Sequence, residues 1–178
     1  MAGKVTGTTN KNGTLPDVYL VCEGATDEAL LAALTQKILR TNHAGISVAI
    51  LAAQGKQQIP GLIQALDDDT RGESRLGIVV DSDGQAEQTK AFLRRNLDLE
   101  KYFVVIADPS VDAWFGEGVK RLVKDPKQIQ RAVEQLDLDV MERRHPEIIV
   151  LRENLTQKPI AVVASQSRTA SDLRDSRS

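Results

Sequence analysis

The sequence is short of cysteine, aromatic residues and long apolar runs. Its single cysteine, Cys22, excludes an intramolecular disulfide and every metal site built from several cysteines. No apolar run approaches the ~20 residues that cross a bilayer. Residues 1–12 are polar and lack the apolar stretch of a secretion signal. We therefore expect a soluble, cytoplasmic protein with no membrane partner.

Aromatic residues make up 3% of the chain, too few for an exposed row of rings on which single-stranded nucleic acid would stack. An excess of positive charge is also missing, because 23 basic and 25 acidic residues leave a formal net charge of −2. Binding of nucleic acid would therefore depend on a local patch or on a bound cation, and not on the field of the whole protein.

The chain does contain enough apolar sequence for a core. Its 178 residues, 41% of them hydrophobic, suit one globular domain and exclude global disorder. Short apolar runs alternate with segments whose apolar residues recur every three to four positions. Strands are predicted at 17–22, 45–51, 76–80 and 102–107, and helices at 26–40, 57–66, 85–96, 111–123 and 126–136.

This alternation predicts an α/β fold, with a mainly parallel sheet of about four strands covered by helices on both faces. We expect Thr26 to cap the helix at 26–40, and residues 67–74 to form an acidic loop. Residues 147–151 fit a fifth strand or a short helix, and residues 159–163 fit another strand or an interaction segment.

We expect the chain to have four parts. Residues 1–16 form a flexible polar lead, and residues 17–125 carry the strand–helix alternation. Residues 126–164 are a C-terminal extension of helices and one strand-like segment. Residues 165–178 are rich in serine, arginine and aspartate, and we expect them to be disordered.

Charged residues follow three of the predicted strands. Glu23 and Asp27 come after the first strand, Lys56 after the second, and Asp81 and Asp83 after the third. Ligands of open parallel sheets bind beyond the carboxyl ends of the strands. We therefore expect these side chains at the ligand-binding edge of the sheet.

Asp81 and Asp83 flank a single residue. In an extended strand, residues two apart point the same way and lie about 6–7 Å apart, so both carboxylates can face one centre together with Glu23. Oxygen ligands without a nearby histidine or cysteine suit Mg²⁺ or Mn²⁺. The alternative is a solvated turn at the strand end, for which Asp83 followed by Gly84 is good turn chemistry.

Two of these segments resemble motifs of one protein family. Residues 21–28, VCEGATDE, resemble the EGxxD glutamate motif of TOPRIM domains, and residues 79–84, VVDSDG, resemble their DxD motif. The order of the motifs and the single strand–helix unit between them also match. The resemblance covers residues 17–125 and implies a Rossmann-like TOPRIM fold.

Two further segments resemble the small OLD-like (overcoming lysogenization defect) proteins of this family. Residues 54–56, QGK, resemble a GGK turn in which Gln54 replaces the first glycine. Residues 109–115, PSVDAWF, resemble a helix start of the form hydroxyl-x-acid-x-Trp, with Ser110 as the expected N-cap.

The resemblance implies a role for each acidic residue. Glu23 would be a general acid or base or a metal ligand, and Asp81 and Asp83 would bind Mg²⁺. Asp27 would complete a second metal site, and Asp112 would be an additional acid. The alternative for Asp112 is a charge placed in the first turn of a helix, where it favours the helix dipole.

Lys56 would stabilise the negative charge that develops on the phosphoryl group. Its alternative is a solvated lysine of the loop. The function implied by the resemblance is Mg²⁺- or Mn²⁺-dependent cleavage of phosphodiester bonds in DNA or RNA.

Small proteins of this kind often work with a separate partner, for example an ATPase in an anti-phage defence system. The near-neutral charge favours dependence on a partner, because an independent nuclease usually presents more positive surface. Two alternatives stay open at this point. One is a non-catalytic TOPRIM-like binding or regulatory subunit, and the other is a primase-type nucleotidyl transferase.

Overall fold

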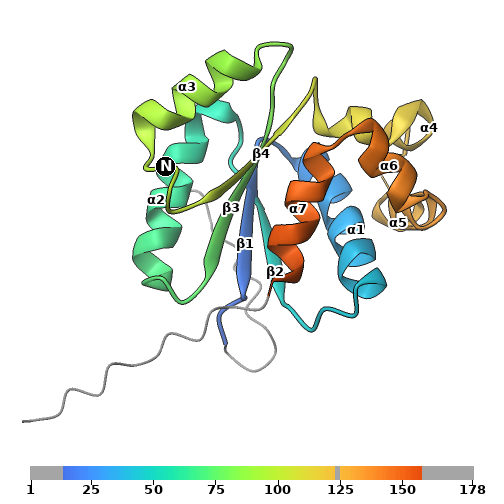
Figure 1. Ribbon diagram of the computed structural model, residues 1–178, viewed down its shortest axis with the longest axis horizontal. Coiled ribbons are helices and arrows are strands. Elements are labelled where there is room, and N and C mark those ends of the chain that lie inside the picture. Colours follow the sequence, from blue (N-terminus) through green and yellow to red (C-terminus); the bar gives the residue numbers. More distant parts are fainter. Residues whose placement is uncertain (1–13, 123–124, 158–178) are drawn as a thin grey trace, which may run out of the picture.

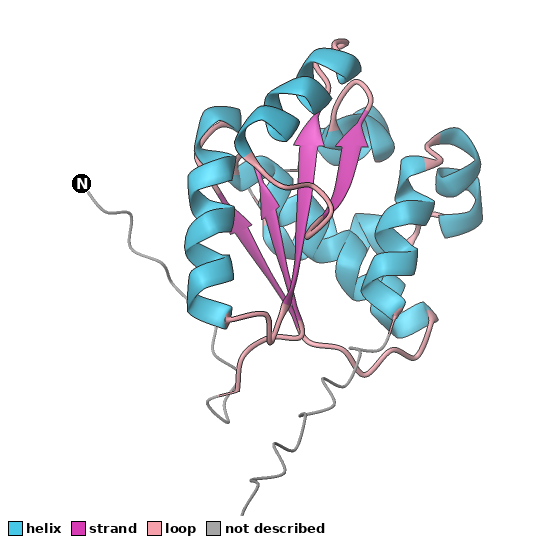
Figure 2. Ribbon diagram, turned by 60° about the vertical axis from the view of Figure 1, so that its left-hand side comes forward, coloured by secondary structure: helices cyan, strands magenta, loops and turns pink. Residues whose placement is uncertain are grey.

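The sheet consists of four parallel strands. In the computed structural model, which describes residues 14–122 and 125–157, the strands are β1 (Val18–Cys22), β2 (Val48–Ala52), β3 (Arg75–Asp81) and β4 (Phe103–Ala107). They lie in the order β2-β1-β3-β4, and Figure 2 shows their arrows pointing toward the same edge. The predicted α/β class and parallel sheet are confirmed.

Helices cover both faces of this sheet (Figure 1). One face carries α1 (Ala25–Thr41), α5 (Pro126–Glu134) and α7 (Glu147–Thr156), and the other carries α2 (Ile59–Thr70) and α3 (Ala86–Asn96). The remaining described helices are short: η1 (Lys56–Gln58), η2 (Val111–Trp114), α4 (Gly116–Lys120) and α6 (Leu138–Arg144). All 5 residues of β1 are buried between the two layers. Of the helices described, none is both long enough and apolar enough to span a membrane.

The C-terminal helices belong to the same core as the sheet. Ile129 on α5 and Leu151 on α7 are buried in one cluster with Leu30 and Leu34 of α1. Residues 147–151 therefore lie in a helix, which decides between the two predicted alternatives. The segment predicted at 159–163, the tail at 165–178 and residues 1–13 of the lead lie outside the described residues.

The start of α1 differs from the prediction. The helix begins at Ala25 with Gly24 as its N-cap, so Thr26 lies inside the first turn. Gly24 is extended, and its carbonyl oxygen accepts the N–H of Glu28 at 3.0 Å, which begins the helical hydrogen bonds. The chain therefore passes from strand to helix directly after Glu23, without a side-chain cap.

Two other helices also differ from the prediction. The acidic loop expected at 67–74 begins later, because α2 continues to Thr70, which is buried on the same helical face as Leu66. The helix expected at 111–123 is divided into η2 and α4. The division falls at Gly116, whose φ of 74° lies in the left-handed region that favours glycine.

Gly77 of β3 lies beside the ring of Phe103 on β4. It pairs with Phe103 in the parallel register, and the tip of the Phe103 ring lies against it. A Cβ atom at residue 77 would lie 2.1 Å from Cζ of Phe103, far inside van der Waals contact. A larger residue at this position therefore requires the ring to move.

We expect Gly77→Ala to lower the free energy of unfolding by about 1–3 kcal/mol, measured by urea denaturation, because the added methyl group overlaps the ring. In a Phe103→Leu background the same substitution should cost much less. Gly61→Ala is the matched control, since no atom lies within 4 Å of a Cβ added in that part of α2. Alanine is the better helix former, so this control should be neutral or stabilising. An equal loss from Gly77→Ala in both backgrounds would contradict the ring contact.

Candidate acidic site at the carboxyl edge of the sheet

The predicted site residues meet at one edge of the sheet. β1 lies between β2 and β3 and is parallel to both. Glu23 follows β1 at the edge where Asp81 ends β3, and Lys56 begins η1 just beyond β2. Asp27 lies in the first turn of α1, and Asp112 lies in η2, which follows β4.

Lys56 joins two of the acids. Its Nζ atom lies 2.7 Å from Oδ2 of Asp83 and 3.6 Å from Oε1 of Glu23. Burial disfavours the charged ammonium, but the hydrogen bond to Asp83 and the charge of Glu23 outweigh it, so the pKa of Lys56 lies above its usual value. The alternative of a solvated loop lysine is therefore wrong.

A tight turn delivers Lys56 to this position. Gln54 and Gly55 have φ values of 64° and 121°, both in the left-handed region. The N–H of Gly55 donates to the backbone oxygen of Glu23 at 2.8 Å, which ties the turn to β1. Glycine is favoured at such φ values. The backbone strain therefore falls on Gln54, which stands at the position of the first glycine in the GGK turn that this segment resembles.

Glu23 is oriented by the neighbouring strand. Its Oε1 atom accepts the N–H of Asp81 at 3.0 Å and is the same atom that faces Lys56. The side chain is 21% exposed. Glu23 therefore combines a fixed orientation with access to solvent.

Asp81 is a carboxyl group whose surroundings oppose its charge. Burial raises its pKa to about 7, and the charges of Asp27, Glu23 and Asp83 act in the same direction. One contact favours the charged form, because Oδ1 of Asp81 accepts the N–H of Val111 at 2.8 Å. Asp81 is thus held in place by η2 while its proton is retained toward neutral pH.

Asp27 and Asp112 extend the acidic site. Burial, together with the charges of Glu23, Asp112 and Asp83, raises the pKa of Asp27 to about 6, although a hydrogen bond with the backbone of Gly24 acts in the opposite direction. Asp112 accepts a hydrogen bond from the hydroxyl group of Ser110. Ser110 is the N-cap residue of η2, as predicted, but it makes no side-chain cap hydrogen bond, because its hydroxyl group donates to Asp112 instead.

Asp83 departs from the predicted geometry. β3 ends at Asp81, and Asp83 has a φ of 50°, which belongs to a turn and not to a strand. Its side chain is 68% exposed and contacts Lys56. We predicted that Asp81 and Asp83 face the same way because side chains alternate along a strand. That alternation does not reach Asp83, since the strand ends at Asp81. Within residues 14–122 and 125–157, no group of three or more acidic, histidine or cysteine side chains is arranged to hold a metal ion.

The chemical type of these side chains nevertheless suits a hard divalent cation. They are all carboxylates, the ligands that Mg²⁺ and Mn²⁺ prefer. Burial is the main cause of the raised pKa values of Asp27 and Asp81, and neighbouring carboxylates add to it; a bound divalent cation would favour the charged form of both groups. Glu23, Asp81 and Asp83, with Asp27, are the residues that would hold such an ion, and this assignment remains a prediction.

Three groups around the site were missed by reasoning from the sequence. Ser82, between the two aspartates, is fully buried, and its hydroxyl group donates to Asp108. The backbone of Val111 holds Asp81. Glu147, 33 positions along the chain from Trp114, accepts the indole N–H of that residue. Contacts over such distances leave no local pattern, so no signal in the sequence points to them.

Comparison with known proteins adds no family assignment. The sequence matches no protein-family model, and it matches no curated protein. The TOPRIM resemblance therefore rests on the motifs and on the contacts between them.

The charge of Asp81 should make the stability of the protein depend on pH. In the unfolded chain this carboxyl group ionises near its usual pKa of 3.8, whereas in the fold its pKa is about 7. Between these values the unfolded state binds fewer protons. With divalent cations chelated, the contribution of Asp81 should therefore lower the free energy of unfolding as the pH rises from about 4 to about 7.

Asp81→Asn removes this contribution, so the melting temperature of the variant relative to wild type should rise across the same pH range. Thermal unfolding in a chelating buffer measures the difference. Asp68→Asn, at an exposed position on α2, is the matched control and should follow wild type. A difference between Asp81→Asn and wild type that stays constant from about pH 4 to pH 8 would contradict the prediction.

Proposed function

We propose that this protein is a TOPRIM-like nuclease of the small OLD-like kind, which cleaves phosphodiester bonds of DNA or RNA with Mg²⁺ or Mn²⁺. The observation that carries the proposal is the direct hydrogen bond between Glu23 and the backbone of Asp81, 58 positions apart. It joins the glutamate motif to the DxD motif at the ligand-binding edge of a parallel sheet. Lys56 completes this contact set.

The surroundings of each side chain support a distinct role. Lys56 carries positive charge that can stabilise negative charge developing on a phosphoryl oxygen. Glu23, whose orientation is supported by the hydrogen bond from the Asp81 N–H, would accept and return a proton. Asp81, Asp83 and Asp27 would hold the cation, which when bound polarises a phosphate oxygen and lowers the pKa of a water ligand.

We further propose that the protein acts with a separate partner, such as an ATPase of an anti-phage defence system. The net charge of −2 supports this, because phosphate contacts by basic residues supply most of the affinity for nucleic acid. A non-catalytic binding subunit and a nucleotidyl transferase would use the same acidic site. The cleavage experiment distinguishes all three.

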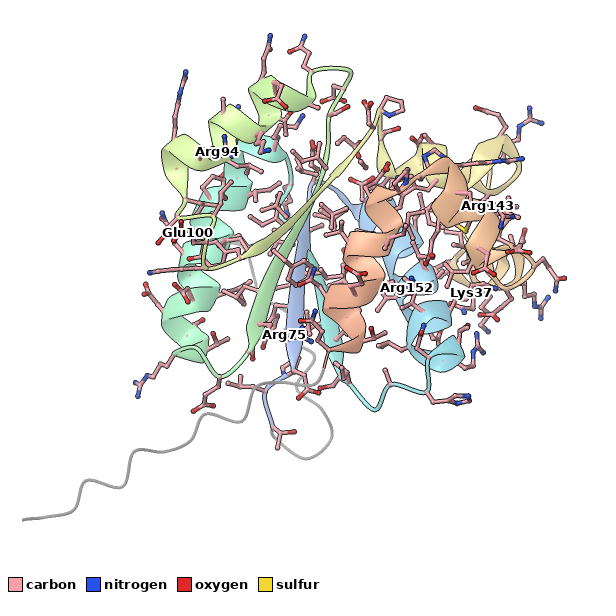
Figure 3. All side chains as sticks on the ribbon, viewed as in Figure 1. Lys37, Arg75, Arg94, Glu100, Arg143 and Arg152 are labelled. Atoms are coloured by element: carbon pink, nitrogen blue, oxygen red, sulfur yellow. The ribbon has the colours of Figure 1, made fainter. Side chains whose placement is uncertain are left out.

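Cleavage of plasmid DNA and of RNA with Mg²⁺ or Mn²⁺ tests the proposal. We expect Glu23→Gln to lower the cleavage rate by on the order of a hundredfold or more, because it removes the charge and the exchangeable proton but keeps the shape. Glu100→Gln is the matched control and should cleave as wild type does. Glu100 is exposed on the loop that leads into β4, at the other end of that strand from the site (Figure 3).

Circular dichroism checks that both variants are folded, and the same comparison is made in the assembled complex if a partner ATPase is required. Equal rates for wild type and Glu23→Gln would remove Glu23 from the mechanism and overturn the nuclease proposal. Incorporation of nucleotides without cleavage would indicate the transferase. Complex formation without any chemistry would indicate the binding subunit.

Binding of Mn²⁺ can be tested without catalysis. A cation that binds only the folded site raises the melting temperature by mass action. We expect Mn²⁺ to raise the melting temperature of wild type, Asp81→Asn to reduce this gain, and Asp68→Asn to leave it unchanged. Equal gains in all three proteins would show that the effect of the ion is non-specific.

A further inference from the structure

A side chain from the C-terminal region reaches toward the acidic site. Glu147 is the first residue of α7, and its Oε1 atom accepts the indole N–H of Trp114 at 2.9 Å and the backbone N–H of Asp108 at 3.4 Å. Nδ1 of His145 lies 3.8 Å from the same oxygen. Glu147 therefore binds both η2 and the loop that connects β4 to η2.

The position of Glu147 is itself fixed by packing. Ile148, Leu151 and Leu155 of α7 are fully buried in the cluster that contains the α1 side chains. A negative charge in the first turn of a helix is stabilised by the helix dipole. The acceptor is therefore held on a rigid element at little energetic cost.

The loop of residues 108–110 is also bound to the residues that follow β3. The hydroxyl group of the buried Ser82 donates to the Asp108 carboxylate, and the N–H of Asp83 donates to the oxygen of Pro109 at 3.0 Å. The loop is thus held between the end of β3 and the start of α7. Each contact limits where the following residue, Val111, can lie.

The helix η2, which follows this loop, in turn holds Asp81. Val111 is 1% exposed, and its N–H is the donor to Oδ1 of Asp81. Trp114, one helical turn further, is 3% exposed, so its indole N–H requires a buried acceptor. If Glu147 is removed, that N–H loses its partner, and η2 gains freedom to move away from Asp81.

We propose that Glu147 is a positioning residue for the acidic site: it holds Trp114 of η2 and the loop of residues 108–110, and Val111 of η2, which follows this loop, holds the Asp81 carboxylate. The inference rests on the proposed metal-dependent function, because the group that Glu147 positions is a proposed ligand of the cation. It also assigns a role to the C-terminal helices, which bring Glu147 to the site.

The only tryptophan of the chain is Trp114, so its fluorescence reports on this contact. The experiment measures Mn²⁺ affinity by calorimetry, together with Trp114 emission, in the full chain. We expect Glu147→Ala to weaken Mn²⁺ binding about tenfold and to shift the emission to longer wavelength as water reaches the indole.

Glu147→Gln keeps an oxygen that can accept the indole N–H, so it should recover most of the affinity that Glu147→Ala loses. Glu153→Ala, an exposed position on α7, is the matched control and should behave as wild type. If Glu147→Ala does not fold, Trp114→Phe removes the indole N–H donor while keeping an aromatic side chain. It should weaken Mn²⁺ binding to a similar extent, and Glu147→Gln should then add little in that background.

Two outcomes would overturn the inference alone. One is wild-type Mn²⁺ affinity in Glu147→Ala, or in Trp114→Phe if the alanine variant is unfolded. The other is a loss in Glu147→Gln as large as that in Glu147→Ala, which would assign the effect to charge and not to the hydrogen bond. A wild-type protein that binds no Mn²⁺ would overturn the proposed metal site and this inference together.

Discussion

Burial of β1 between β2 and β3 is the constraint on which the site depends. Because the strands are parallel, their carboxyl ends lie at one edge of the sheet. Glu23, Lys56 and Asp81 therefore come together although they are far apart in sequence. All 5 residues of β1 are buried, so its side chains pack against helical layers on both faces. A shift by one residue would exchange the side chains that face the two helical layers.

The same constraint gathers negative charge. Burial and mutual repulsion raise the pKa values of Asp27 and Asp81, and Lys56 offsets the charge of Glu23 and Asp83. Lys56 offsets only part of the repulsion among the acids, so the packing beneath the site has to hold Asp27 and Asp81 in place. Such perturbed acids in a ligand-binding position are typical of functional sites, and this supports the proposed cation chemistry.

The C-terminal helices take part in both the core and the site. α5 and α7 pack with α1 in one hydrophobic cluster, and α7 supplies Glu147 to the contacts around Trp114. The predicted extension begins at residue 126, where the TOPRIM resemblance ends, and its helices share one core with α1. A resemblance between motifs does not record which helical faces are buried together.

Much of the fold follows from local pattern. The spacing of apolar residues predicts the buried strand before Glu23 and the helix that contains Leu30 and Ile38. The alternation of strands and helices, and with it the parallel sheet, could therefore be predicted. Because parallel strands end at one edge, the shared location of Glu23, Lys56 and Asp81 could be predicted as well.

The direction in which each side chain points, and the residues that it contacts, could not be predicted from local pattern. Asp83 leaves the strand in a left-handed turn and meets Lys56, and Glu147 reaches Trp114 from a helix 33 positions away. Whether a side chain faces a neighbour depends on where its strand ends and on which distant element packs against it. Residue order therefore determines which groups reach the carboxyl edge, and only the packed tertiary structure decides which of them touch.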